Sequence, residues 1–125
     1  MTNEAAGILI VEDSHFIRYL LKKNIEQLEM QTVGECSTAA EALILYQKCK
    51  PDIVIVDHSL PDQTGTKLVE DLLTLDIYAR IILLIPMRME YEAQNLIAMG
   101  VQSVISKPFY PEPLQKSLIE VVFSQ

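Results

Sequence analysis

Residues 81–86 read IILLIP, five aliphatic residues followed by a proline. A run this short that is apolar at every position is typical of a strand that is covered on both faces, as in a parallel sheet between layers of helices. Two further runs have the same character, ILIV at residues 8–11 and IVIV at residues 53–56. The three runs predict strands of one parallel sheet.

Longer segments with a helical period separate these runs. Their apolar residues recur three and four positions apart, as the following groups show: Ile17, Leu20, Leu21, Leu28; Ala39, Ala42, Leu43, Tyr46; Leu68, Leu72, Leu75; Ala93, Leu96, Ile97; and Leu114, Leu118, Val121. Two weaker strand signals, Thr32-Val33 and Val104-Ile105, complete five strand-and-helix units. Strict alternation predicts an α/β fold, a doubly wound sheet of five parallel strands with right-handed crossovers and five helices.

The expected ends of the helices carry suitable residues. Ser14, either Ser37 or Thr38, and Thr64 are candidate N-caps, Gly100 is a candidate helix stop, and Pro111 suits a first helical turn.

Length and composition indicate one domain over residues 1–125, with half of the residues apolar. The formal charge of -7, from 17 acidic and 10 basic residues, argues against direct binding to nucleic acid. No secretory signal and no stretch near the roughly 18 apolar residues of a membrane span is present in the sequence. The lone cysteines Cys36 and Cys49 suggest reduced core thiols. We therefore expect a cytoplasmic protein that does not bind membranes.

Charged residues follow three of the expected strands. Glu12-Asp13 comes after the first strand, Asp57 after the third and Lys107 after the fifth. The carboxyl ends of the strands of a doubly wound sheet lie along one edge, where ligands bind. We therefore expect these four side chains to converge.

Three carboxylates gathered in one place repel one another unless a cation lies between them. Mg²⁺ suits such oxygen ligands, and a lysine adds positive charge for an arriving anion. Asp57 is then a candidate nucleophile for phosphoryl transfer, with Glu12 and Asp13 as metal ligands. Taken singly, each residue is also consistent with a helix cap, a turn or a solvated surface.

With these residues in place, the sequence resembles the receiver domain of two-component response regulators over nearly its whole length. The resemblance rests on ILIVEDS at 8–14, PDIVIVDHSLPDQTG at 51–65 and SKPFYPEPL at 106–114. It implies a flavodoxin-like sheet with the strand order 2-1-3-4-5. Because the fifth expected helix ends within a few residues of Gln125, we expect a stand-alone receiver without an output domain, unless the chain is part of a longer regulator.

The resemblance also implies roles for individual residues. Asp57 would be the phosphoacceptor, and Lys107 would contact the phosphoryl group. Glu12, Asp13, Asp57 and the backbone carbonyl of Ser59 would bind Mg²⁺, and the Lys107-Pro108 bond would be cis. Such a domain is not a conventional enzyme: it catalyses its own phosphoryl transfer and its own dephosphorylation. Its phosphodonor would be a sensor histidine kinase or a histidine phosphotransfer protein, and its output partner is open.

Two positions depart from the family. Receivers typically have Thr or Ser at the end of the fourth strand and Tyr or Phe on the fifth, where this chain has Ile85 and Val104. Pro86 follows Ile85 and lacks an N–H donor. A ligand shifts a conformational equilibrium only through contacts that differ between the two states, and Ile85 offers the phosphoryl group none. We expect phosphorylation with a weak or atypical output switch.

Other readings of the sequence stay open. A phosphorylation-independent scaffold would explain Ile85 and Val104, but it would leave the acidic cluster unused. A flavin carrier would need a hydroxyl- and Gly-rich loop where VEDSHF stands. His15 and His58 could carry a phosphoryl group or a metal, although solvated or local roles suit them better. Receivers commonly use one face for partners or homodimers; here it would include Met87, Met89, Tyr91, Val104 and Tyr110.

Overall fold

Five parallel strands form one sheet in the computed structural model, which describes residues 5–124. The strands are β1 (Gly7–Val11), β2 (Gln31–Cys36), β3 (Ile53–Asp57), β4 (Ile81–Pro86) and β5 (Ser103–Lys107). Their order across the sheet is β2-β1-β3-β4-β5, and every neighbouring pair is parallel. The predicted doubly wound, flavodoxin-like sheet is confirmed.

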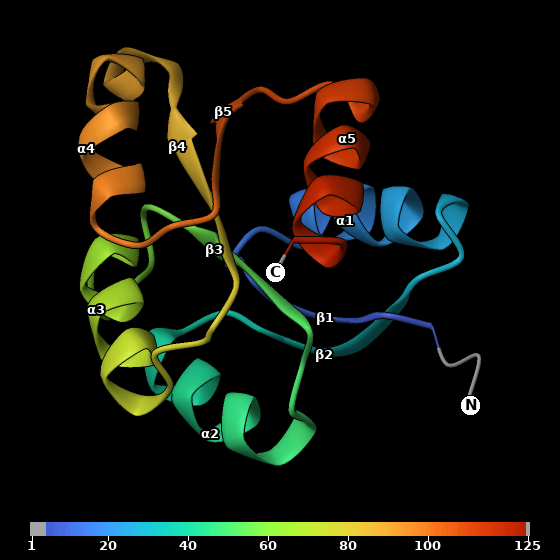
Figure 1. The fold of residues 1–125 in the computed structure, drawn as a ribbon, viewed down its shortest axis with the longest axis horizontal. Coiled ribbons are helices and arrows are strands. Elements are labelled where there is room, and N and C mark those ends of the chain that lie inside the picture. The colour runs from blue at the N-terminus through green and yellow to red at the C-terminus, as the bar shows by residue number, and fades with distance from the viewer. Residues whose placement is uncertain (1–4, 125) are drawn as a thin grey trace.

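Helices cover both faces of this sheet. They are α1 (His15–Gln27), α2 (Ala39–Cys49), α3 (Gly65–Leu75), α4 (Ala93–Ala98) and α5 (Pro111–Val122). Figure 1 shows α1 and α5 on one side of the sheet and α2, α3 and α4 on the other. Because successive side chains of a strand point to opposite faces, Ile8 and Ile10 pack with Leu21 of α1, whereas Leu9 and Val11 join the opposite core.

Three of the helices begin at hydroxyl N-caps. The side chains of Ser14, Thr38 and Thr64 accept hydrogen bonds from the backbone N–H groups three residues further on. The structure thus selects Thr38 over Ser37 as the cap of α2. Gly100 follows α4 with a φ of +120°, and a Cβ there would approach Leu73 Cδ1 to 2.8 Å, so the position requires glycine.

The structure extends the sequence prediction in two places. Strand β2 spans six residues rather than the predicted pair Thr32-Val33, and its residues are mostly half-buried or exposed because it lies at the sheet edge. A 3-10 helix, η1 (Met87–Glu92), connects β4 directly to α4. Both segments lack the apolar periodicity by which the other elements could be recognised.

The described residues include no helix that is long and apolar enough to cross a membrane. Cys36 is buried and Cys49 half-buried, and both thiols are free. Burial is the main cause that raises the pKa of the Cys36 thiol to about 11. This agrees with the expectation of reduced core cysteines.

Candidate functional site

The charged residues at the strand ends converge at the carboxyl edge of the sheet. Asp57 and Lys107 are the last residues of β3 and β5, and Glu12 directly follows β1. Strand β4 lies between β3 and β5, so the Lys107 side chain reaches across it. Its Nζ lies 2.7 Å from Glu12 Oε1 and 2.9 Å from Asp57 Oδ1. The Lys107-Pro108 peptide bond is cis, as predicted.

The three predicted acidic residues form one cluster. One oxygen from each of Glu12, Asp13 and Asp57 lies within 4.8 Å of the others. Glu12 and Asp57 are buried, whereas Asp13 is exposed, so the cluster has one open side. Glu12 Oε1 is buried without a hydrogen-bond partner among residues 5–124; its 2.7 Å contact with Lys107 is an ion pair by distance alone. An oxygen-only cluster with one exposed side fits a hard divalent cation such as Mg²⁺.

Burial and the neighbouring charges shift the pKa values of Glu12 and Lys107 in opposite directions. Desolvation is the main cause that raises the pKa of the Glu12 carboxyl, against the lowering effects of Lys107 and the Ser14 N–H. Desolvation also disfavours the charged form of Lys107, but its contacts with Glu12 and Asp57 prevail and raise the pKa of the amine. The lysine is therefore a permanent positive charge at neutral pH.

The loop after Asp57 is held close to the end of β3. The His58 N–H donates to the Leu84 carbonyl at 2.8 Å, and the Gly65 N–H donates to the His58 carbonyl at 2.6 Å. Ser59 pairs with Thr64 in an isolated bridge. A Cβ at Gly65 would overlap the Asp57 carbonyl oxygen, so only glycine permits this approach. The loop thus keeps Ser59 near the acidic cluster, while the metal-binding role of its carbonyl stays a prediction.

A second contact ties the same loop to helix α2. The carboxylate oxygens of Asp62 accept hydrogen bonds from the N–H groups of Ala39 and Ala40 at 2.9 and 3.0 Å. These two bonds are the first causes that lower the pKa of Asp62. The loop is therefore anchored at both ends, on the sheet and on a helix N-terminus.

The two atypical positions are filled by apolar packing. Ile85 is completely buried in the core on the α2, α3 and α4 side, and Val104 packs against the same core. Leu60 and Met89 also pack against it. Neither Ile85 nor Val104 has a side-chain polar atom, so neither can hydrogen-bond to an anion at the acidic cluster.

The two histidines make local contacts. His15 Nδ1 lies 2.7 Å from Arg18 Nη2, and His58 Nδ1 lies 3.4 Å from Ser59 Oγ. Neither histidine belongs to the acidic cluster of Glu12, Asp13 and Asp57. These contacts favour the local roles over the phosphoryl-carrier or metal-ligand alternative.

The predicted partner face is only partly exposed. Met87, Tyr91 and Tyr110 are exposed, whereas Met89 and Val104 pack against the core. The exposed portion is therefore smaller than the sequence predicted.

Sequence reasoning did not single out Arg18. This residue of α1 is buried, and its guanidinium contacts the Glu12 carbonyl and the Glu35 carboxylate. The available signal was a basic residue in the first turns of the helix that follows the acidic pair.

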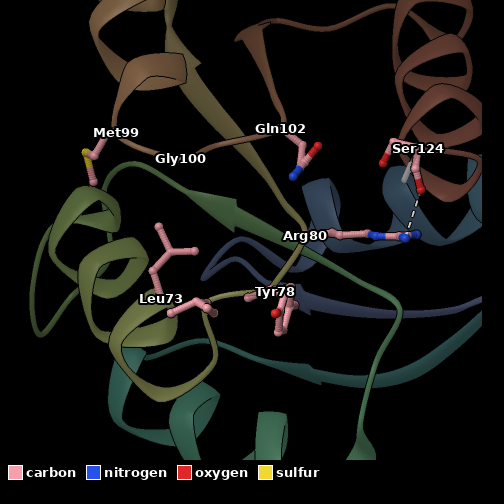
Figure 2. Close-up of a pocket in the computed structure, with 9 residues that line it drawn as sticks. Leu73, Tyr78, Arg80, Met99, Gly100, Gln102 and Ser124 are labelled. Atoms are coloured by element: carbon pink, nitrogen blue, oxygen red, sulfur yellow. Dashed lines mark hydrogen bonds between the residues drawn. The ribbon is translucent and has the colours of Figure 1, made fainter.

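A surface pocket of about 400 Å³ lies away from the acidic cluster (Figure 2). Its lining includes Tyr78, Arg80, Gly100 and Gln102, which precede β4 and β5 and so mark the amino edge of the sheet. Arg80 donates to the Ser124 carbonyl at 2.8 Å, as Figure 2 shows, and also to two carbonyls at the end of α5. This arginine stabilises the carboxyl end of the helix and contributes nothing to the carboxylate cluster.

Comparisons with known proteins agree with this geometry. The family model for the response regulator receiver domain matches residues 8–119. The chemotaxis protein CheY of Thermotoga maritima is 32% identical over 114 residues, which cover 91% of this chain and 95% of that protein. Protein CcdB of Bacillus subtilis is 32% identical over 102 residues, covering 82% of this chain and 85% of that protein.

A solved structure extends the likeness to the fold. The CheX-CheY-BeF3-Mg+2 complex from Borrelia burgdorferi contains a chain that superposes with a TM-score of 0.89 at 22% identity. The match covers 98% of this chain and 92% of that one.

Proposed function

The chain belongs to the family of response regulator receiver domains of two-component systems, and from this membership we propose that it accepts a phosphoryl group on Asp57 in a Mg²⁺-dependent reaction. One observation carries the proposal. Lys107 reaches across β4 to contact both Glu12 and Asp57, and Asp13 completes the acidic cluster beside them. The nucleophile, the metal ligands and a fixed positive charge are thus brought together from three strands.

Each side chain has a distinct part in this reaction. A carboxylate oxygen of Asp57 attacks the phosphorus of a phosphohistidine, the P–N bond breaks, and an acyl phosphate forms. Lys107 offsets negative charge on the transferred phosphoryl oxygens. A Mg²⁺ ion bound by Glu12, Asp13, Asp57 and the Ser59 carbonyl supplies further positive charge. The same groups catalyse dephosphorylation by water.

The proposal also includes a biological setting, which family membership and the acidic composition support. A sensor histidine kinase or a histidine phosphotransfer protein donates the phosphoryl group. Residues 1–125 act as one receiver domain in the cytoplasm, without direct contacts to nucleic acid or membrane. The exposed residues Met87, Tyr91 and Tyr110 offer a face for an output partner or a homodimer.

We further propose that the output switch is weak. Ile85 and Val104 fill the switch positions with buried or half-buried aliphatic side chains. Loss of one donor to a charged phosphoryl oxygen lowers the stabilisation of the phosphorylated state by roughly 1.5–3 kcal/mol. Phosphorylation at Asp57 itself does not require that donor.

The test is intact-mass measurement after incubation with Mg²⁺ and acetyl phosphate. Wild type should gain one phosphoryl group, whereas Asp57→Asn should gain none. Asp71→Asn is the matched control, because this carboxylate lies on α3 and pairs with Lys67 rather than with the site. It should be phosphorylated like wild type.

Two outcomes would count against the proposal. Equal phosphorylation of Asp57→Asn would place the acceptor elsewhere, for instance on a histidine. No gain in any of the variants would favour the phosphorylation-independent scaffold.

A further inference from the structure

Arg18 is a buried cation that contacts the main chain of Glu12, one residue of the acidic cluster. Its side chain is 10% exposed, and its three nitrogens make three different contacts. Nη1 donates to the main-chain carbonyl of Glu12 at 2.5 Å, Nε donates to Glu35 Oε1 at 3.1 Å, and Nη2 lies 2.7 Å from His15 Nδ1. The arginine therefore connects α1 and β2 to the residue that follows β1.

The contact with Glu12 fixes a metal-site residue from its main-chain side. The Glu12 N–H donates to the Cys36 carbonyl at 3.0 Å, and the Glu12 carbonyl accepts from Arg18. Both backbone groups of Glu12 are thus satisfied by partners from β2 and α1. Its carboxylate lies at the cluster, where Oε1 contacts Lys107 Nζ at 2.7 Å and Oε2 accepts from the Ser14 N–H at 3.0 Å.

The positive charge of Arg18 is partly offset. Glu35 pairs with Arg18 at 3.1 Å and also with Lys22 at 2.9 Å, so one carboxylate is shared by two cations. A paired guanidinium repels a nearby cation less than an unpaired one, while its donors still hold the backbone in place.

We propose that Arg18 is a positioning residue that holds the Glu12 main chain, and with it the Glu12-Asp13 pair, in the arrangement that binds a divalent cation. This inference rests on the proposed function, which places Mg²⁺ at the same carboxylates. Removal of a residue that hydrogen-bonds to a metal ligand and orients it typically lowers metal affinity 10- to 100-fold. Arg18 acts through Glu12 and does not touch the reacting atoms.

The proposal predicts the sign of the effect. Removal of a positive charge near a cation site would tighten Mg²⁺ binding, whereas loss of a positioning contact would weaken it. Because Glu35 offsets part of the charge of Arg18, and Arg18 contacts the Glu12 main chain directly, the loss of position should dominate. We expect the Mg²⁺ Kd of Arg18→Met to rise by about tenfold.

Isothermal titration calorimetry with MgCl₂ measures this Kd directly, without phosphorylation. Lys22→Met is the first control, because Lys22 shares Glu35 with Arg18 but has no contact with Glu12. Ile25→Val is the second, because it loosens the packing of the same helix two turns further on. Both controls should keep the wild-type Kd, and Arg18→Lys should recover part of the affinity through one donor.

A second measurement separates positioning from catalysis. The rate of phosphorylation of Arg18→Met by acetyl phosphate should reach half its maximum at a higher Mg²⁺ concentration. Its maximal rate at saturating Mg²⁺ should equal that of wild type.

The outcomes distinguish this inference from the proposed function. An unchanged or tighter Kd in Arg18→Met would overturn the positioning role and leave the function intact. An equal rise in the Mg²⁺ Kd of Ile25→Val would also overturn it, since the weaker binding would then reflect a loss of helix stability alone. Wild type that binds no Mg²⁺ would overturn both.

Discussion

Ile85 is the residue on which the proposed weak output switch depends. It ends the buried part of β4, and its side chain is completely buried in the core against which Val104 also packs. A hydroxyl in its place would enter an apolar environment without an assured partner. Ile85 therefore stabilises the unphosphorylated fold and offers no hydrogen bond to a phosphoryl group.

The substitution Ile85→Thr should lower the stability of the fold and increase its structural response to phosphorylation. A buried hydroxyl without a partner costs about 1–3 kcal/mol, so urea unfolding should show a lower free energy of unfolding than for the isosteric control Ile85→Val. With beryllofluoride and Mg²⁺, the amide resonances of residues 85–105 should shift more in the Thr variant than in wild type or the Val variant. Large shifts in wild type would show that the switch is not weak.

The main site residues could be predicted because each is a local signal. Asp57, Glu12 and Lys107 are charged residues directly after apolar runs, and a parallel sheet brings such positions together. Arg18 and the Asp62 cap could not be predicted, since their partners lie on other elements and only the packed helices bring them within hydrogen-bond distance.

At the scale of elements, one hydrogen bond ties α2 to the end of α3. The Tyr46 hydroxyl donates to Asp76 Oδ2 at 2.6 Å, while the Tyr78 N–H donates to the other oxygen of Asp76. The Tyr46 contact is the first cause that lowers the pKa of Asp76 below its ordinary 3.8. The contact therefore stabilises the fold more strongly while Asp76 is ionised than when it is protonated.

Tyr46→Phe should lower the free energy of unfolding by about 1 kcal/mol at pH 7, since the bond is to a charged but partly solvated carboxylate. A lowered carboxyl pKa contributes stability above the unfolded pKa and loses it as pH falls through the folded pKa. The difference from wild type should therefore shrink below about pH 4, as urea unfolding at pH 7 and pH 3 would reveal.

Tyr78→Phe is the control for this prediction, because that ring is exposed and its hydroxyl has no hydrogen bond among residues 5–124. It should leave stability unchanged at both pH values. A difference for Tyr46→Phe that persists undiminished at pH 3 would contradict the ionic origin of its effect.

Elements with strong periodicity were predictable, and those without it were not. Strands β1, β3 and β4 are apolar, apart from Asp57 at the end of β3, because helices cover both of their faces. Strand β2 lies at the sheet edge, so its residues did not need to be apolar, and only Thr32-Val33 gave a signal. The 3-10 helix η1 has no buried residue, and of its side chains only Met89 packs against the core, so its sequence contains no clear helical signal.

At the scale of the whole molecule, the proposed metal site exists only when the sheet is complete. Its carboxylates come from the ends of β1 and β3, and the unfolded chain does not bring them together. A ligand that binds only the folded state stabilises it by mass action. Mg²⁺ binding and global stability should therefore be linked.

Addition of Mg²⁺ to 100 times its Kd should raise the free energy of unfolding by about 2.7 kcal/mol. Urea unfolding at several Mg²⁺ concentrations, with ionic strength held constant by NaCl, would measure the change in midpoint. Asp13→Asn should lose most of this stabilisation, whereas Asp71→Asn, which removes the same charge from α3, should retain it. Equal stabilisation of both variants would indicate general ion binding instead of a site.

The sequence by itself determined the fold class, the strand order expected from the family resemblance, and the positions of Glu12, Asp13, Asp57 and Lys107. The fold class and the four charged positions follow from short apolar runs and the charges next to them, which are local properties of the chain, whereas the strand order follows from the resemblance. The tertiary structure alone decided that Lys107 contacts two carboxylates across β4 and that Arg18 holds the Glu12 backbone. The reason is physical: a side chain's partners depend on which elements pack beside it, and that packing joins residues far apart in sequence.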